Sequence, residues 1–234
     1  MAYAGTMGRR RGHSGGLPGR LIWIALCLAG AGLAGAPVAY MLWPAPRAIS
    51  PDAPSLPITI GGIAFNVPPA AIRFKVQRRP GAQARVDLTF VWPLLTPPYL
   101  TIKPLPTDKP EVTDRLFVTI AASDSTLPPL ERFKVIYPRY LDAAPVVGTD
   151  GLSTQVFRDG TAYQGEDLIL DPQRPEQFLL RCTRLTSLTP PMCLHERRIG
   201  GADITVRFPR EWLTDWRAVF EGIERLIAGF KPQI

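Results

Sequence analysis

The residue types that could do chemistry in this chain gather in one short segment, which holds two cysteines and a histidine. Cys182 and Cys193 stand on either side of a Thr-, Ser- and Pro-rich stretch, and His195 follows Cys193 by two positions. A thiolate next to a histidine can act as a nucleophile, whereas two cysteines in an oxidising compartment usually form a disulfide bond. Because residues two positions apart on a strand share a face, contact between His195 and Cys193 is compatible with the first alternative.

The two cysteine-containing segments, EQFLLRCTR and PMCLHERRI, both have the residue pattern of strands. In an antiparallel hairpin of these strands, Cys182 and Cys193 can lie directly opposite each other, which predicts a disulfide bond between them. The same register places two more pairs of side chains opposite each other: Leu180 with His195, and Phe178 with Arg197.

Metal and acid-base chemistry have weaker support in the sequence. Zinc held by histidine and cysteine needs three or four ligands, and residues 44–234 contain one histidine and two cysteines. No C-x-x-C, H-E-x-x-H or P-loop motif occurs. The adjacent carboxylates Glu166 and Asp167 could suit a glycosidase, but in a strand they point to opposite faces. We therefore predict no catalytic residue, no metal ligand and no cofactor.

Two tyrosines in turn-rich segments are candidates for contact with a partner. They are Tyr99 in PLLTPPYL and Tyr163 in DGTAYQGED. An aromatic ring on a loop supplies a large contact area with few rotatable bonds, which suits recognition. Loop aromatics also commonly pack back on their own domain, so both alternatives stay open.

The positive charge of the chain is concentrated near its N-terminus. The net charge is +7, from 27 basic and 20 acidic residues, and no acid occurs before Asp52. Four basic residues precede an apolar segment at residues 21–43: Arg9, Arg10, Arg11 and Arg20. The rest of the chain is therefore close to neutral and does not predict the basic stripe of a nucleic-acid-binding protein. We expect no nucleic-acid partner.

The apolar segment from Leu21 to Trp43 carries no charge. At about 1.5 Å per residue it is long enough to cross the roughly 30 Å hydrocarbon core of a bilayer as a helix. Trp23 lies near one end and Tyr40 near the other, where aromatic rings prefer the headgroup region. Because the arginines precede the segment, residues 1–20 should form a basic cytoplasmic tail and the C-terminal domain should be periplasmic.

Two further interpretations of the apolar segment concern cleavage and dimerisation. A cleaved signal peptide is the alternative to an anchor, but the apolar run exceeds the usual length of about 7–15 residues, and Pro37 follows the small residues 34–36. Small residues four positions apart allow close approach of two membrane helices and suggest a weak homodimer. These pairs are Ala31 with Gly35 and Gly32 with Ala36.

Beyond the apolar segment, the sequence predicts a spacer and then a sheet. Residues 44–57 contain five prolines, which favours an extended linker. In residues 58–234, short segments with period-two alternation or β-branched and aromatic residues recur between turn signals, as expected for a mainly antiparallel sheet. In the most regular segment, Val86, Leu88 and Phe90 share one face, so this strand should be half buried. The expected strands are residues 57–65, 84–91, 115–121, 153–158, 166–170, 176–183, 191–198 and 202–208.

Two helices should accompany these strands. The first should begin near Thr126, where a hydroxyl can cap it, and end before Pro138. The second should follow Pro209, because apolar residues then recur at three- and four-residue steps. They are Trp212, Trp216, Val219, Phe220, Ile223, Leu226, Ile227 and Phe230. This stripe predicts an amphipathic helix packed across the sheet, which completes an α+β domain.

The function that these features favour is binding. We expect a single-pass protein of the inner membrane whose periplasmic domain is a non-enzymatic binding or scaffolding module for another envelope protein. The alternative is an envelope-acting hydrolase whose active site has no recognisable sequence motif.

Overall fold

The computed structural model describes residues 22–24, 27, 53–98, 114–142, 144–184 and 190–231. The chain divides into two units, Met1–Arg47 and Ala48–Ile234. In the first unit, residues 22–24 and Cys27 are helical and exposed. The other residues of the predicted tail, membrane segment and spacer up to residue 52 lie outside the described part. Of the described helices, none is both long enough and apolar enough to cross a membrane.

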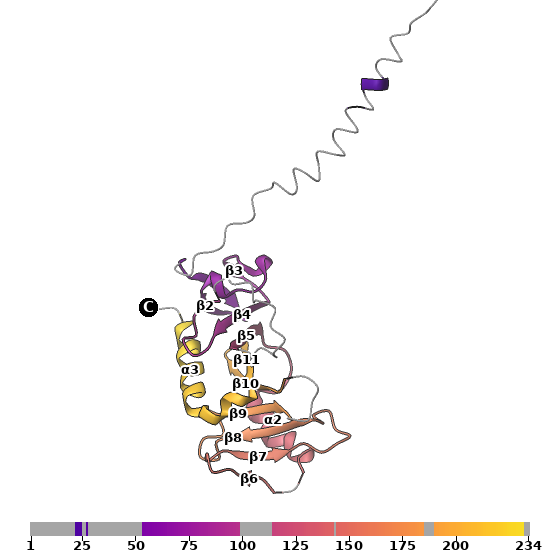
Figure 1. Cartoon of the computed structure of the whole chain (residues 1–234), viewed down its shortest axis with the longest axis vertical. Coiled ribbons are helices and arrows are strands. Elements are labelled where there is room, and N and C mark those ends of the chain that lie inside the picture. Colours follow the sequence, from indigo (N-terminus) through magenta and orange to yellow (C-terminus); the bar gives the residue numbers. More distant parts are fainter. Residues whose placement is uncertain are drawn as a thin grey trace, which may run out of the picture. The chain divides into compact units, whose positions relative to one another are not determined.

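Within the described residues of the second unit, eight strands form one antiparallel sheet in the order β4-β5-β11-β10-β9-β8-β7-β6 (Figure 1). Each strand is hydrogen-bonded to its neighbours in this order, and every pairing is antiparallel. The strands are β4 (Arg85–Val91), β5 (Arg115–Ala122), β6 (Val146–Val147), β7 (Ser153–Val156), β8 (Glu166–Leu170), β9 (Leu179–Thr183), β10 (Met192–Ile199) and β11 (Ala202–Pro209). The predicted α+β class, with a mainly antiparallel sheet, is confirmed.

A smaller sheet precedes the large one and corrects one sequence prediction. Residues 57–65, expected as a single strand, contain the end of β1 (Leu56–Ile60), a turn, and the start of β2 (Ile63–Val67). Gly61 and Gly62 both have positive φ, so they close a two-residue hairpin that a side-chain-bearing residue would strain. The short strand β3 (Gly81–Ala82) pairs in parallel with β1.

Helical segments cover both faces of the large sheet. On one face lie the 3-10 turn η4 (Arg210–Asp215) and helix α3 (Trp216–Gly229), and α2 (Pro129–Val135) and the turn η3 (Tyr137–Arg139) lie on the other, near β8 and β9 (Figure 1). The first helix begins three residues later than expected, because Thr126 donates hydrogen bonds to Asp124 and does not cap a helix. Two further 3-10 turns, η1 (Pro69–Ala71) and η2 (Lys75–Gln77), precede β4.

The main core lies between α3 and the sheet, as the apolar stripe predicted. Val86, Leu88 and Phe90 of β4 are fully buried on this face, and every residue of the stripe is buried or packs against the cluster. Phe230, at the end of the stripe, lies 6.0 Å from Phe90 between ring centroids. A second core under α2 and η3 contains Tyr137, Leu141, Phe157, Leu168 and Leu179.

Strand β4 is buried on both faces, although its alternation suggested a half-buried strand. Residues 72–78 run along its free edge, where Arg73 donates its backbone N–H to the carbonyl of Asp87 at 2.9 Å. Burial alone would raise the pKa of Asp87, but hydrogen bonds from Arg85, Gln77 and Thr119 outweigh it and hold that pKa below its usual value. The segment 72–78 therefore protects an edge strand that would otherwise be open to pairing.

Candidate functional site

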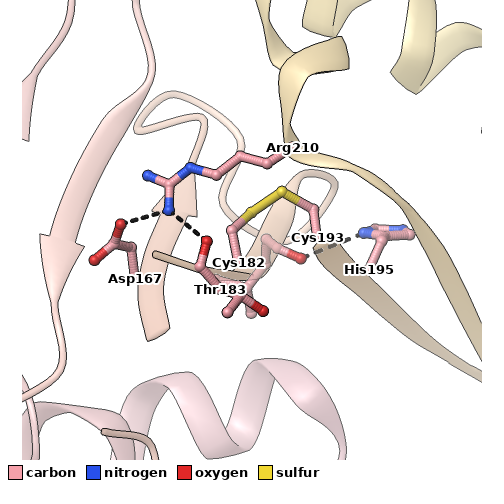
Figure 2. The surroundings of a disulfide bond; sticks show 7 residues. Asp167, Cys182, Thr183, Cys193, His195 and Arg210 are labelled. Carbon is pink, nitrogen blue, oxygen red and sulfur yellow. Dashed lines mark hydrogen bonds and ion pairs between the residues drawn. A yellow bond between two sulfur atoms is a disulfide. The ribbon is translucent and has the colours of Figure 1, made fainter. Parts of the chain in front are cut away.

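The cysteine hairpin has the predicted register. Cys182 and Cys193 are paired residues of β9 and β10 and form a disulfide bond with an S–S distance of 2.04 Å (Figure 2). Leu180 lies opposite His195, as expected. Phe178 precedes β9 and does not pair with Arg197. Its ring packs instead against the aromatic rings of α3, 5.0 Å from that of Trp216.

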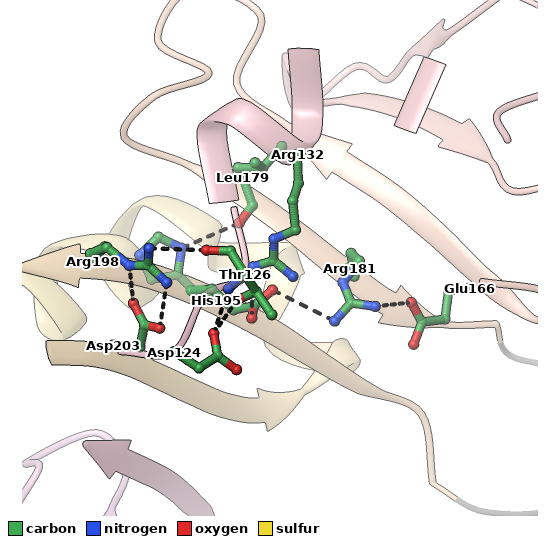
Figure 3. Close-up of polar contacts among 10 residues, drawn as sticks. Asp124, Thr126, Arg132, Glu166, Leu179, Arg181, His195, Arg198 and Asp203 are labelled. Carbon is green, nitrogen blue, oxygen red and sulfur yellow. Dashed lines mark hydrogen bonds and ion pairs between the residues drawn. The ribbon is translucent and has the colours of Figure 1, made fainter. Parts of the chain in front are cut away.

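His195 is 3% exposed, and its Nδ1 lies 3.3 Å from the carbonyl oxygen of Leu179 (Figure 3). Because a carbonyl only accepts, the proton of the neutral ring lies on Nδ1, and the buried Nε2 has no hydrogen-bond partner among the described residues. Burial, helped by the charge of Arg197, lowers the pKa of His195 to about 4. Since both nearby sulfurs are in the disulfide, the Cys-His nucleophile alternative is wrong.

The neighbouring carboxylates Glu166 and Asp167 point to opposite faces of the sheet, as predicted, and each binds arginine. Asp167 accepts from Arg210 at 2.6 Å and from Arg184 at 3.3 Å, while Arg210 also donates to the carbonyl of Thr183 (Figure 2). Glu166 accepts from Arg181 at 3.0 Å on the other face. The ion pairs of Asp167 therefore lie on the face that carries the disulfide, whereas the pair of Glu166 with Arg181 lies on the opposite face of the sheet.

A second polar network fixes α2 to the sheet (Figure 3). Glu196 of β10 lies 2.9 Å from Arg132 of α2 and 3.6 Å from Arg181 of β9. Burial would lower the pKa of Arg132, but its hydrogen bond to Glu196 raises it above the usual value. Arg198 pairs with Asp203 at 2.6 Å and also donates to the carbonyl of Thr126. In the described residues, no group of three His, Cys, Asp or Glu side chains could hold a metal ion.

Of the two tyrosines predicted as partner contacts, Tyr99 lies outside the described residues. Tyr163 packs within the second core, with its ring centroid 4.9 Å from that of Phe157 and 5.2 Å from that of Tyr137. The guanidinium of Arg181 lies 5.2 Å from the same ring. Most of the Tyr163 ring is therefore used inside the domain, and its contact with a partner stays a prediction.

One candidate binding surface is a groove of about 270 Å³ where β4 and β5 meet the segment before β4. We call it the basic groove. It is lined by Ala70, Ala71, Ile72, Arg73, Arg78, Thr89, Pro98, Arg115 and Phe117. Thr89 and Phe117 are paired residues of β4 and β5, so their side chains lie side by side on the face opposite α3.

The three arginines make this groove cationic, and they come from separate parts of the chain. Arg73 and Arg78 belong to the stretch RFKVQRR, and no acid occurs between Ala53 and Val86. That stretch was the only sign of the groove in the sequence. Arg115 comes from β5, and its position beside the other two depends on the fold.

Comparisons with known proteins give likeness of fold only. No family model matches the chain, and no curated protein matches its sequence. Smlt3025, an immunity protein of the Stenotrophomonas maltophilia type IV secretion system, has a similar structure, with a TM-score of 0.51 and 13% identity over 80% of this chain and 98% of that one. The iron-regulated outer membrane lipoprotein FrpD of Neisseria meningitidis matches with a TM-score of 0.42 and 7% identity over 80% of this chain and 96% of that one.

Proposed function

We propose that this chain is a membrane-tethered envelope protein whose periplasmic domain is a non-enzymatic module that binds another envelope protein. The observation that carries the proposal is the basic groove. It combines a concave surface, the guanidinium groups of three arginines and aromatic contact area, which are features of protein-binding sites.

The groups that might otherwise do chemistry already have structural partners in the domain. Cys182 and Cys193 are joined to each other, and Asp167 is bound by two arginines. His195 is neutral at physiological pH because its pKa is about 4, and it contacts a backbone carbonyl. These arrangements hold strands and helices together and so favour a rigid binding module over an enzyme.

Three features support the periplasmic location. A buried disulfide is typical of oxidising compartments such as the periplasm. The arginines before the apolar segment 21–43 favour export of the C-terminal domain. The likeness of fold to a secretion-system immunity protein agrees with a role at the envelope.

Topology can be tested with a phosphatase fused after Ile234, since this reporter folds only outside the cytoplasm. We expect an active fusion, and an activity no higher than that of a cytoplasmic control would contradict the orientation. A fusion that is active but released from membranes by carbonate washing would contradict the anchor and favour cleavage.

Binding through the groove can be tested by placing a photoreactive phenylalanine analogue at single positions of the full chain in cells. Phe117 lines the groove and Phe74 lies beside it, so both replacements keep an aromatic ring. Glu221 and Arg225, on the exposed face of α3, are the controls. We expect a discrete protein adduct from the groove positions alone. Equal adducts from all four positions, or none from Phe117 and Phe74, would refute the proposal.

A further inference from the structure

We infer that the ligand of the basic groove is an acidic segment of the partner protein, held by its carboxylates. This inference rests on the proposed binding function and names the chemistry that the site recognises. Its central element is a set of guanidinium groups whose positions are fixed by the domain before any ligand arrives.

Arg78 is held in place by the backbone of the segment that walls the groove. Its Nε and Nη2 donate hydrogen bonds to the carbonyl oxygen of Ile72 at 3.1 and 2.8 Å. A guanidinium has five N–H donors, so this anchor leaves donors free for an incoming acceptor. Because the side chain is already ordered, binding loses less conformational entropy than it would with a free arginine.

Arg73 is positioned by aromatic rings. Its guanidinium carbon lies 5.0 Å from the centroid of Phe117 and 5.6 Å from that of Phe74. Such stacking orients the planar group and leaves its edge available for a carboxylate, which a guanidinium can bind with two parallel hydrogen bonds. No carboxylate among the described residues lies within ion-pair distance of Arg73 or Arg78.

The charge around the groove is strongly one-sided. Among the described residues, the ion-pair partner of Arg115 is Asp114, at 3.8 Å on the exposed rim. Arg207 of β11 is exposed opposite Phe117, on the same face of the sheet. Among the described residues on this face, these four arginines outnumber the carboxylates, which are Asp114 and the buried Asp87 that Arg85 already binds. An anionic ligand has the complementary charge.

The shape and surroundings favour a peptide over a lipid surface. The volume of about 270 Å³ lies below the roughly 300 Å³ at which pockets for drug-sized ligands begin, and it suits one or two side chains. Next to it, Phe74 is 49% exposed and Val76 is 77% exposed. Arginine and aromatic residues around a concave site are the composition of protein hot spots, whereas a bilayer presents a flat surface with no side chain to insert.

The test uses the full chain in a non-ionic detergent and a fluorescein-labelled hexaglutamate peptide, with binding measured by fluorescence anisotropy at low salt. The variant is Arg73→Gln with Arg78→Gln. The matched control is Arg139→Gln with Arg225→Gln, which removes the same charge from exposed positions on η3 and α3. We expect binding at least tenfold weaker for the groove variant and less than twofold weaker for the control.

Because Arg78 also binds the backbone, a second variant, Arg115→Gln with Arg207→Gln, removes one charge from the groove and one from the sheet face beside it without touching that anchor. It should weaken binding at least fivefold. Equal weakening by control and groove variants would overturn the inference. So would tight binding to phosphatidylglycerol vesicles without peptide binding, or full displacement of the peptide by equimolar inorganic phosphate.

Failure of this inference and failure of the proposed function are distinguishable. If photo-adducts at Phe117 persist unchanged in the Arg73→Gln and Arg78→Gln variant, the domain binds a protein there but not through its carboxylates. If Phe117 gives no adduct in the wild-type chain, the binding function itself fails.

Discussion

Acidification should destabilise the domain through His195 before the carboxylates titrate. The folded pKa of His195 is about 4, because burial disfavours the charged ring, while an unfolded histidine has a pKa of about 6.5. As pH falls, the unfolded chain therefore binds this proton first. The stabilising contribution is fully present above about pH 6.5 and is lost between pH 6.5 and pH 4.

The size of the effect follows from the two pKa values. A difference of about 2.5 units at 1.36 kcal/mol per unit gives a limit of roughly 3.4 kcal/mol, and at pH 5 the loss is about 2 kcal/mol. Paired carboxylates such as Asp87, whose pKa is lowered, lose their contribution only at lower pH. The window between pH 7 and 5 therefore isolates the histidine.

The assay is urea unfolding followed by tryptophan fluorescence at several pH values between 7.5 and 5. The matched variant is His195→Asn, because the asparagine amide can still donate to the Leu179 carbonyl but does not titrate. The variant should be less stable at pH 7.5, since a smaller side chain leaves a cavity, but its stability should change little down to pH 5. Equal losses of stability by wild type and variant over this range would show that His195 does not cause the pH dependence.

Further predictions concern the disulfide, a buried ion pair and a close backbone approach. Replacing Cys182 and Cys193 by alanine should lower the free energy of unfolding, measured with urea, by about 3 kcal/mol. This is the loop-entropy contribution of a disulfide with a sequence separation of 11. A loss below about 1 kcal/mol would contradict it. Asp167→Ala leaves Arg184 and Arg210 without their shared carboxylate and should lower the free energy of unfolding by about 2–3 kcal/mol in the same assay. An unchanged urea midpoint would show that these ion pairs do not stabilise the domain. Gly61→Ala should lower stability by more than about 2 kcal/mol, because φ is +57° and the added Cβ would lie 1.7 Å from a carbonyl oxygen of the β10–β11 turn. Gly62→Ala is its control, with φ of +79° and no atom within 4 Å, and it should cost only about 1 kcal/mol; similar losses for both would show that the close approach is unimportant.

The spacing of apolar residues predicted those helices and strands whose stabilising contacts depend on residues within one short segment. The stripe from Trp212 to Phe230 identified the helix and the face it buries, although the first turn is 3-10 rather than α. The hairpin register followed from placing Cys182 opposite Cys193. In both cases the side-chain period of the element was enough to determine which residues meet.

Features that depend on tertiary packing were harder to predict. The Gly61-Gly62 turn splits one predicted strand, and a doubled glycine was the available signal. Asp87 is buried because residues 72–78 fold back along β4. The alternation of residue types within β4 gives no sign of this segment. The basic groove escaped prediction because its arginines lie in segments separated by more than 35 residues, so only the fold brings them together.

Short motifs would have misled a search for an active site. Residues 12–16 match the pattern G-x-S-x-G, and residues 30–35 match G-x-G-x-x-G. Each motif works only between a strand and a helix, and both matches lie at or before the apolar segment, ahead of the first expected strand. In a glycine-rich stretch these patterns carry no functional information.

The central claim is that the domain binds an envelope protein through the basic groove. Photocrosslinking from position 117 of the tethered chain in cells, compared with position 221 on α3, tests it most directly. We expect one discrete adduct at position 117 that is absent at position 221 and weakened in the Arg73→Gln and Arg78→Gln variant. No adduct at position 117, or the same adduct at both positions, would contradict it.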